Sequence, residues 1–465
     1  MTMTTIDRPF RFPLICTENV VFSGLFLMLL MMRLFLRSPL LELDEAEQVV
    51  MAQSLHVGYA NQPPLYSWLQ YLVFQLMGVS LFSVALLKSL LLTGCAWLYF
   101  KISRLHCATP THALCAALSW ALIPAISLDL IKDNTHSVMA LLMACMTWYV
   151  FVGCRHLGRV KRCVLFAGVI GGGFLSKFNY FLFLLPLLFC YWRLITPKER
   201  RVLVISLLLA VVIASPYWYW LLNHAEIGLH AASKLVPQNK THWRGLINLM
   251  KSLIFFLAPL ISLFFFFPIS PFRQSKSIAN RLLDHYHFAA LLFLFLVAII
   301  AGFRDFETRW LIPVFFLAPL LVFSRVTSDE YTKYRQTPFI IFCLLVQCVY
   351  MGTLIYRSHH GHQRQPVLIE AINRQIPANA DWLISESFWL LGNLRLQNPQ
   401  IKIKAVTATT PLPTGKLVLL WLADTPPFWI VPLEQITQNP AELFRDQENG
   451  KVVAGLLAYE HSRIK

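Results

Sequence analysis

Charged residues are scarce in this chain, and the motifs of several common soluble enzyme classes are missing. Only 14% of its 465 residues are charged, whereas 57% are hydrophobic. A water-soluble chain of this length needs more polar surface to cover its core. No HExxH, GxSxG or GxxxxGK[ST] motif occurs, so the sequence gives no support for zinc-protease, serine-hydrolase or P-loop chemistry.

The ten cysteines contain no CxxC pair and no zinc-ligand spacing, so neither a redox dithiol nor a structural zinc site is predicted. Most lie inside apolar blocks, where cysteine behaves as a small hydrophobic residue. Asp133, Asn134 and His136 share one short loop but lack a firm ligand spacing. We therefore expect no metal ion and no bound cofactor.

Long apolar runs dominate instead. Residues 20–36, 205–222 and 291–302 approach or reach the length that spans a bilayer, and such runs must be helical in lipid. The first run lacks a small-x-small cleavage site, so we interpret it as a retained helix. About eleven transmembrane helices are predicted, near residues 19–37, 80–100, 111–128, 136–154, 163–176, 179–195, 202–222, 246–268, 285–302, 310–324 and 338–356.

The net charge of +16 is concentrated in short loops between these runs. When the loops alternate across the bilayer, the set that begins with Arg8 and continues through Arg159 and Arg200 holds far more Lys and Arg than the opposite set. The basic set is therefore predicted to be cytoplasmic. This predicts a multi-pass protein whose C-terminal segment lies outside the cell membrane, in the periplasm if the cell is a Gram-negative bacterium. No nucleic-acid motif is present, and nucleic acid is not an expected partner.

Two further features lie on the outer side. The loop at 38–79 is amphipathic, and it predicts two surface helices, near 43–55 and 65–77, separated by Pro63 and Pro64. From residue 357 onward polar residues return, with strands expected at 382–385 and 416–422 and a helix at 367–375. The predicted division is a transmembrane domain at 1–356 and a small periplasmic α/β domain at 357–465.

Ionisable residues gather at the outer ends of the predicted spans. Charges so close to a bilayer are costly and tend to mark function. The set comprises Asp44, Glu45, Glu47, Asp129, Lys132, Asp133, His136, Lys177, Arg304, Asp305, Glu307 and Arg309.

Each of these groups has a structural alternative. Asp44 is either a general base or the cap of a surface helix. Lys177, after three glycines, is either a phosphate partner or a lysine reaching for the interface. The segment 304–309 is either an anion clamp or an interfacial charge cluster.

Four motifs in order carry a family resemblance. They are Asp-Glu-Ala-Glu at 44–47, Gln-Pro-Pro-Leu-Tyr-Ser-Trp at 62–68, Gly-Phe-Leu-Ser-Lys at 173–177 and Arg-Trp-Leu-Ile-Pro at 309–313. Together they resemble the GT-C glycosyltransferases of the protein-mannosyltransferase superfamily, family 39 and its relatives. The residues of these motifs are most similar to those of bacterial galacturonosyltransferases or aminoarabinose transferases, which modify lipid A or lipopolysaccharide core.

The resemblance implies a GT-C fold and an inverting transfer of a sugar from an undecaprenyl-phosphate donor to an acceptor such as lipid A or lipopolysaccharide core. It implies Asp44 as the base, with Glu45 and Asp133 as further catalytic acids. It implies Lys177 and Arg309 near the leaving phosphate. The full set of residues expected to bind donor phosphate or substrate is Lys177, Arg304, Arg309, Tyr59, Pro63, Pro64 and His136. Gln62 stands where many relatives have Lys, which leaves the donor sugar open.

Two alternatives remain at this point. One is a transporter or flippase for a lipid-linked sugar, which would show mid-membrane ionisable groups and internal repeats. The other is a glycosyltransferase that acts on protein or on another glycan.

Overall fold

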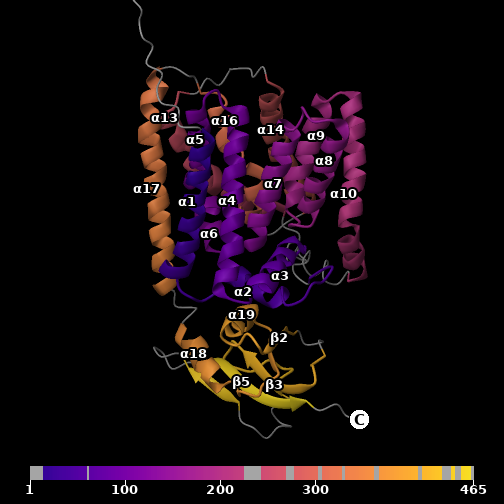
Figure 1. The fold of residues 1–465 in the computed structure, drawn as a ribbon, viewed down its shortest axis with the longest axis vertical. Helices are drawn as coiled ribbons and strands as arrows, with labels where there is room; N and C mark the ends of the chain where they lie inside the picture. Colours follow the sequence, from indigo (N-terminus) through magenta and orange to yellow (C-terminus); the bar gives the residue numbers. More distant parts are fainter. Residues whose placement is uncertain are drawn as a thin grey trace, which may run out of the picture.

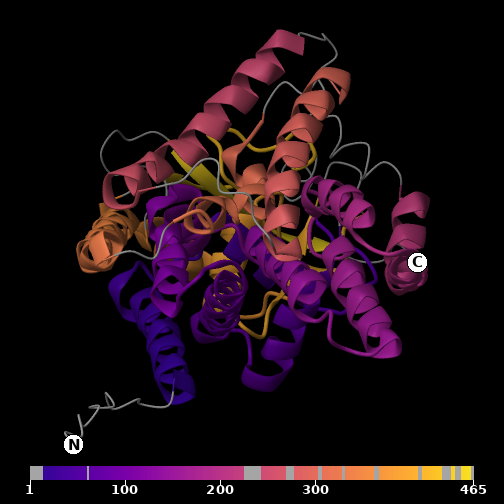
Figure 2. The same cartoon turned by 90° about the horizontal axis from the view of Figure 1, so that it is seen from above.

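The structure is a computed structural model. It describes residues 14–59, 62–224, 242–268, 277–301, 306–326, 330–360, 366–406, 411–431, 441–445 and 452–461. Figure 1 shows a helical bundle above a small sheet, with the short helices α2 and α3 between them. In Figure 2, viewed from above, the yellow strands lie behind the middle of the bundle.

Every expected span corresponds to helical structure in the described residues. The bundle contains α1 (Leu14–Met31) with the π-helix η1 (Met32–Leu36), α4 (Leu81–His106), α5 (Pro110–Leu118), η2 (Ser119–Leu122), η3 (Ala125–Asp129), α6 (Leu130–Lys132), α7 (Thr135–Gly153), α8 (Arg159–Phe174), α9 (Tyr180–Leu194), α10 (Pro197–Asn223), α12 (His242–Leu257), η4 (Ala258–Ser262), α13 (Leu263–Phe266), α14 (Ile278–Ala301), η5 (Thr308–Leu311), α15 (Ile312–Phe315), α16 (Ala318–Phe323) and α17 (Glu330–His360).

The number of membrane crossings is less regular than the sequence suggests. Among the described residues, seven helices are long and apolar enough to cross, and a pair bent by 75° at 110–132 would make eight. The expected span at 310–324 is divided between η5, α15 and α16, with Pro313 and Pro319 near the breaks, because proline interrupts helical hydrogen bonding. The chain is a multi-pass membrane protein, while the count of eleven stays a prediction.

The two surface helices form close to their expected bounds, as α2 (Leu43–Met51) and α3 (Leu65–Met77). A capping box begins α2, in which the Glu42 and Glu45 side chains each accept from the other residue's backbone amide. Gly78, with φ of 74°, ends α3, since a left-handed conformation is easy only for glycine. Neither helix is long enough to span a bilayer.

The C-terminal part contains a five-stranded sheet of order β2-β1-β3-β5-β4. Strand β1 (Trp382–Ser385) pairs in parallel with β2 (Lys402–Ala405) on one side and with β3 (Gly415–Trp421) on the other. Strand β5 (Val452–His461) pairs antiparallel with β3 and with β4 (Glu442–Arg445). Helices α18 (Pro366–Gln375) and α19 (Phe388–Gln397) accompany it. The small C-terminal α/β unit is thus present, and the domain boundary at 357 stays a prediction.

The hydrophobic cores show how the sheet joins the bundle. One core fills the bundle, and a second combines residues of α2, such as Ala46 and Val49, with Trp389 of α19 and with Leu383 and Ile403 of the sheet. Helix α2 therefore shares its apolar face with the C-terminal part. Its opposite, acidic side is left to face the bundle, where the candidate site lies.

Candidate active site

Asp44 meets Asp133 at the junction of α2 with the bundle. The backbone amide of Asp44 donates a hydrogen bond to Oδ1 of Asp133 over 3.0 Å. Asp44 is the second residue of α2 and is half-buried. Asp133 lies between α6 and α7, next to Asn134, whose φ of 62° is left-handed, a conformation that asparagine tolerates better than most residues. The structure thus brings two of the predicted catalytic acids together.

The electrostatic setting of Asp133 is unusual for an aspartate. Burial and then the Asp44 carboxylate raise the pKa of Asp133 to about 7, while Lys88 acts in the opposite sense. Desolvation and like charge both disfavour ionisation of a carboxyl group. Asp133 can therefore gain or release a proton near neutral pH, beside a carboxylate that is partly open to solvent.

Glu45, the third predicted catalytic acid, has a different environment. It is fully buried, and its oxygens lie 2.8 Å from Arg33 Nη2 and 3.1 Å from Lys88 Nζ. Burial opposes ionisation, but Arg33 and Lys88 together hold the pKa of Glu45 well below its usual range. Because both oxygens are engaged by cations, the carboxylate stays ionised and anchors α2 to η1 and α4.

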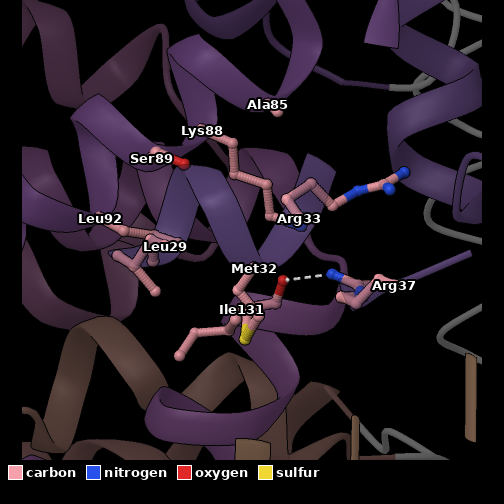
Figure 3. A pocket seen from close by; sticks show the side chains of 9 residues that line it. All are labelled: Leu29, Met32, Arg33, Arg37, Ala85, Lys88, Ser89, Leu92 and Ile131. Carbon is pink, nitrogen blue, oxygen red and sulfur yellow. Dashed lines mark hydrogen bonds between the residues drawn. The ribbon is translucent and has the colours of Figure 1, made fainter. Parts of the chain in front are cut away.

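A cavity of about 250 Å³, counted with the space open to solvent, lies beside this ion-pair network. Figure 3 shows that its lining combines three basic side chains with apolar groups from α1, α4 and α6. Arg37 donates to the carbonyl oxygens of Ile131 (3.2 Å) and Lys132 (3.1 Å) and pairs with Glu42 at 3.2 Å. Arg37 therefore ties the end of η1 to the chain just before Asp133 and to the cap of α2.

Lys177 lies in the turn between α8 and α9. Its side chain is 9% exposed, and its Nζ donates to Ser137 Oγ over 2.7 Å. Within the described part of the chain Lys177 forms no ion pair. Burial and then the charge of Arg309 lower the pKa of Lys177 to about 8, while Asp44 raises it. A buried cation without an anion is costly, so this position favours an anionic ligand.

The glycine motif brings Lys177 into place. A Cβ at Gly173 would lie 2.1 Å from the Tyr180 ring, so only glycine lets α8 approach α9 this closely. The backbone amide of Leu65 donates to the carbonyl oxygen of Leu175 over 2.9 Å. This bond joins the turn formed by the buried Pro63 and Pro64 to the turn that carries Lys177.

Arg309 approaches the same region from η5. It pairs with Glu307, and its Nη1 lies 3.4 Å from Asn134 Oδ1, next to Asp133. Its charge acts on Lys177, which places the two cations near one another. Arg304 and Asp305 lie outside the described residues. Arg309 is therefore linked to the loop that carries Asp133 through its hydrogen bond to Asn134.

Hydrogen bonds hold the other predicted binding residues, within one loop for Tyr59 and between distant segments for His136. Tyr59 closes its own loop, since its hydroxyl donates to the carbonyl oxygen of Ser54 over 2.9 Å. His136 is buried, and its Nε2 lies 2.9 Å from Gln48 Nε2. Ser67 Oγ donates to Gln48 Oε1 over 2.7 Å. Sequence reasoning missed Gln48 and Ser67, although Gln48 follows Asp44 by one helical turn on α2.

Comparisons with known proteins agree with this architecture. The family model described as dolichyl-phosphate-mannose-protein mannosyltransferase matches residues 61–220. The lipopolysaccharide core galacturonosyltransferase RgtB of Rhizobium johnstonii is 27% identical over 412 residues, which cover 82% of this chain and 82% of that protein. The lipopolysaccharide core galacturonosyltransferase RgtA of Rhizobium johnstonii is 24% identical over 415 residues, which cover 83% of this chain and 81% of that protein.

The solved structure of ArnT from Cupriavidus metallidurans bound to undecaprenyl phosphate matches with a TM-score of 0.66 at 13% identity, over 95% of this chain and 98% of that one. The protein is a membrane glycosyltransferase with the GT-C fold. In this glycosyltransferase, the segment matched by the family model runs from just before α3 to α10 and contains Asp133 and Lys177. Asp44 and Arg309 lie outside that segment, and the fold places both beside it.

Proposed function

We propose that this glycosyltransferase moves a sugar from a polyprenyl-phosphate carrier to lipopolysaccharide core or lipid A at the periplasmic face of the inner membrane. RgtA and RgtB are named for lipopolysaccharide core, a third similar protein of Rhizobium johnstonii is named for lipid A, and the ArnT structure contains undecaprenyl phosphate. All three curated relatives are galacturonosyltransferases, so a galacturonosyl carrier is the first donor to test.

The observation that carries this proposal is the hydrogen bond between Asp44 and Asp133, near enough to the buried cation Lys177 for the Asp44 charge to act on it. The Asp44 carboxylate takes the proton of the acceptor hydroxyl as the hydroxyl oxygen attacks the anomeric carbon of the donor sugar. The bond from that carbon to the phosphate oxygen breaks, and the carrier leaves as its phosphate. Attack opposite to the leaving group inverts the anomeric configuration.

The cations have their role in the second half of the step. Negative charge develops on the phosphate as the glycosidic bond breaks, and Lys177 and Arg309 are fixed before the reaction begins. Preorganised charges of this kind stabilise a transition state without reorganisation. Lys177 retains its proton at neutral pH, because its pKa is about 8. Asp133 keeps the Asp44 backbone in place.

The experiment uses purified protein in detergent with undecaprenyl-phosphate galacturonate and isolated lipid A or core acceptors. Product formed without a bilayer supports the transferase and excludes a pure flippase. Asp44→Asn should lower kcat by roughly 10²- to 10⁴-fold, the range of one general base. Asp424→Asn, at an exposed position on the C-terminal part, is the matched control. Full activity of Asp44→Asn would refute the assignment of the base.

A further inference from the structure

Helix α19 of the C-terminal part holds the residue that leads into α2 by both of its backbone groups. Asn393 Oδ1 accepts from the Leu41 amide over 2.7 Å, and Trp389 Nε1 donates to the Leu41 carbonyl oxygen over 2.9 Å. Leu41, Trp389 and Asn393 are all at most 5% exposed. Buried backbone groups need partners, and here both partners come from a segment about 350 positions later in the chain.

The middle of α2 is in direct contact with the α19 backbone. A Cβ at Gly392 would lie 2.6 Å from the Ala46 carbonyl oxygen and 2.7 Å from its Cα. Glycine is therefore required for the observed separation of the two helices. Any side chain at this position would push α2 away from α19 and toward the bundle, along the side that carries Asp44.

The far end of α2 is fixed by the sheet. Gln53 Nε2 donates to the Ile403 carbonyl oxygen over 3.1 Å, and the Ile403 amide donates to Gln53 Oε1 over 3.3 Å. Ile403 belongs to β2, an edge strand. The side-chain amide of Gln53 thus satisfies the backbone N–H and C=O of Ile403 at the open edge of the sheet, as a further strand would. The C-terminal part consequently holds α2 before its start, at its centre and past its end.

We infer that Trp389 and Asn393 are positioning residues for the transfer reaction, which act by fixing α2 so that Asp44 stays aligned with Asp133 and Lys177. This inference rests on the proposed role of Asp44. Helix α2 has nine residues, and so short a helix is not stable alone in water. Its acidic side is held by Arg33 and Lys88 through Glu45, and α19 supplies the opposing support.

The reaction rate depends steeply on the position of Asp44 relative to the substrate. A displacement of about 1 Å at a reacting group can lower a rate by roughly 10²-fold. Lys177 lies in the turn between α8 and α9 and Arg309 lies in η5, and among the described residues no hydrogen bond or ion pair joins either cation to α19. Loss of the α19 contacts should therefore lower kcat while the KM for the donor stays nearly constant, because the phosphate site itself is unchanged.

The test compares Asn393→Leu and Trp389→Phe with Ile384→Ala in the full-length protein. Asn393→Leu removes the acceptor for Leu41 at similar volume, and Trp389→Phe removes only the indole donor while keeping an aromatic ring. Ile384 is fully buried in the core on the other face of the sheet, so its truncation destabilises the C-terminal part without touching α2. Each variant is measured for kcat, donor KM, Tm and hydrogen exchange of the peptide that covers residues 41–52.

We expect Asn393→Leu and Trp389→Phe to lose at least tenfold in kcat with donor KM changed less than twofold, and to exchange the α2 amides faster. Ile384→Ala should retain kcat despite a comparable loss in Tm. The inference is overturned if kcat survives while α2 protection falls, or if Ile384→Ala loses as much kcat as the two α19 variants. If Asp44→Asn remains active, the proposed function fails instead, and the exchange measurement still reports whether α19 fixes α2.

Discussion

The backbone amide of Asp44 donates to the carboxylate of Asp133 across 3.0 Å, although 89 positions separate the two residues. This bond lets Asp133 hold the start of α2 and places its carboxyl group beside a second acid. The Asp44 carboxylate therefore contributes to the raised pKa of Asp133.

Asp133→Asn should alter the pH dependence of stability. The pKa of Asp133 in the folded protein, about 7, lies above the ordinary aspartate value of about 3.9. Protonation therefore favours the folded state, and this contribution is complete below about pH 4 and is lost as the pH rises through about 7. Thermal unfolding between pH 4 and 8 should show a smaller decline for Asp133→Asn, whose amide oxygen can still accept from Asp44. Parallel curves for both proteins would contradict the assignment.

Lys177→Met should separate function from stability. Removing the cation should lower kcat/KM for the donor by roughly 10²-fold, the effect of losing one preorganised charge contact. The pKa of Lys177, about 8, lies below the ordinary lysine value of about 10.4. The lysine therefore disfavours folding at neutral pH and less so as the pH rises toward 10. Tm at pH 7 should stay equal or increase, and an unchanged kcat/KM would remove Lys177 from the phosphate site.

Glu45→Gln should destabilise the protein strongly. The change leaves Arg33 and Lys88 buried without a counter-charge, which typically costs about 3–5 kcal/mol. The double variant Glu45→Gln/Lys88→Met removes one of the stranded cations and should recover part of the loss. Chemical denaturation in detergent measures both variants. If Glu45→Gln alone has the same free energy of unfolding as the native protein, the ion-pair network does not anchor α2.

Gly173→Ala tests the close approach of α8 to α9. The added methyl would overlap the Tyr180 ring, and overpacking of this kind costs typically 1–3 kcal/mol. Gly168→Ala on the same helix is the control, because no atom lies within 4 Å of a Cβ there. We expect a lower Tm and weaker donor binding for Gly173→Ala alone. Equal behaviour of the two variants would remove the steric argument.

Membrane orientation can be tested at Asp424, which is exposed on the C-terminal part. Asp424→Cys should react with a membrane-impermeant maleimide in intact spheroplasts if that part faces the periplasm. The unmodified protein provides the background, because five of the nine cysteines that the structure describes are buried and the others, Cys348 among them, set the level of background labelling. Labelling that appears only after the spheroplasts are lysed would reverse the proposed topology and place Asp44 at the cytoplasmic face.

Much of this architecture was accessible from local patterns. Apolar runs predicted where the helices lie, apolar residues at helical spacing opposite acidic ones predicted α2, and α3 begins and ends where the sequence suggested. The strands at 382–385 and near 416–422 were equally visible. Composition and periodicity report local burial and backbone state, and both are properties of neighbouring residues.

Long-range contacts were decided by the tertiary structure. No local pattern shows that Glu45 is neutralised by Arg33 and Lys88, or that Gln48 links Ser67 to His136. Nor does any local pattern show that α19 binds the backbone of Leu41, just before α2. Such contacts join positions that are distant in sequence, so they depend on how completed helices pack rather than on what any single segment prefers. The sequence determined that acids and bases would gather at one end of a membrane bundle, whereas packing decided which carboxylate remains free to react.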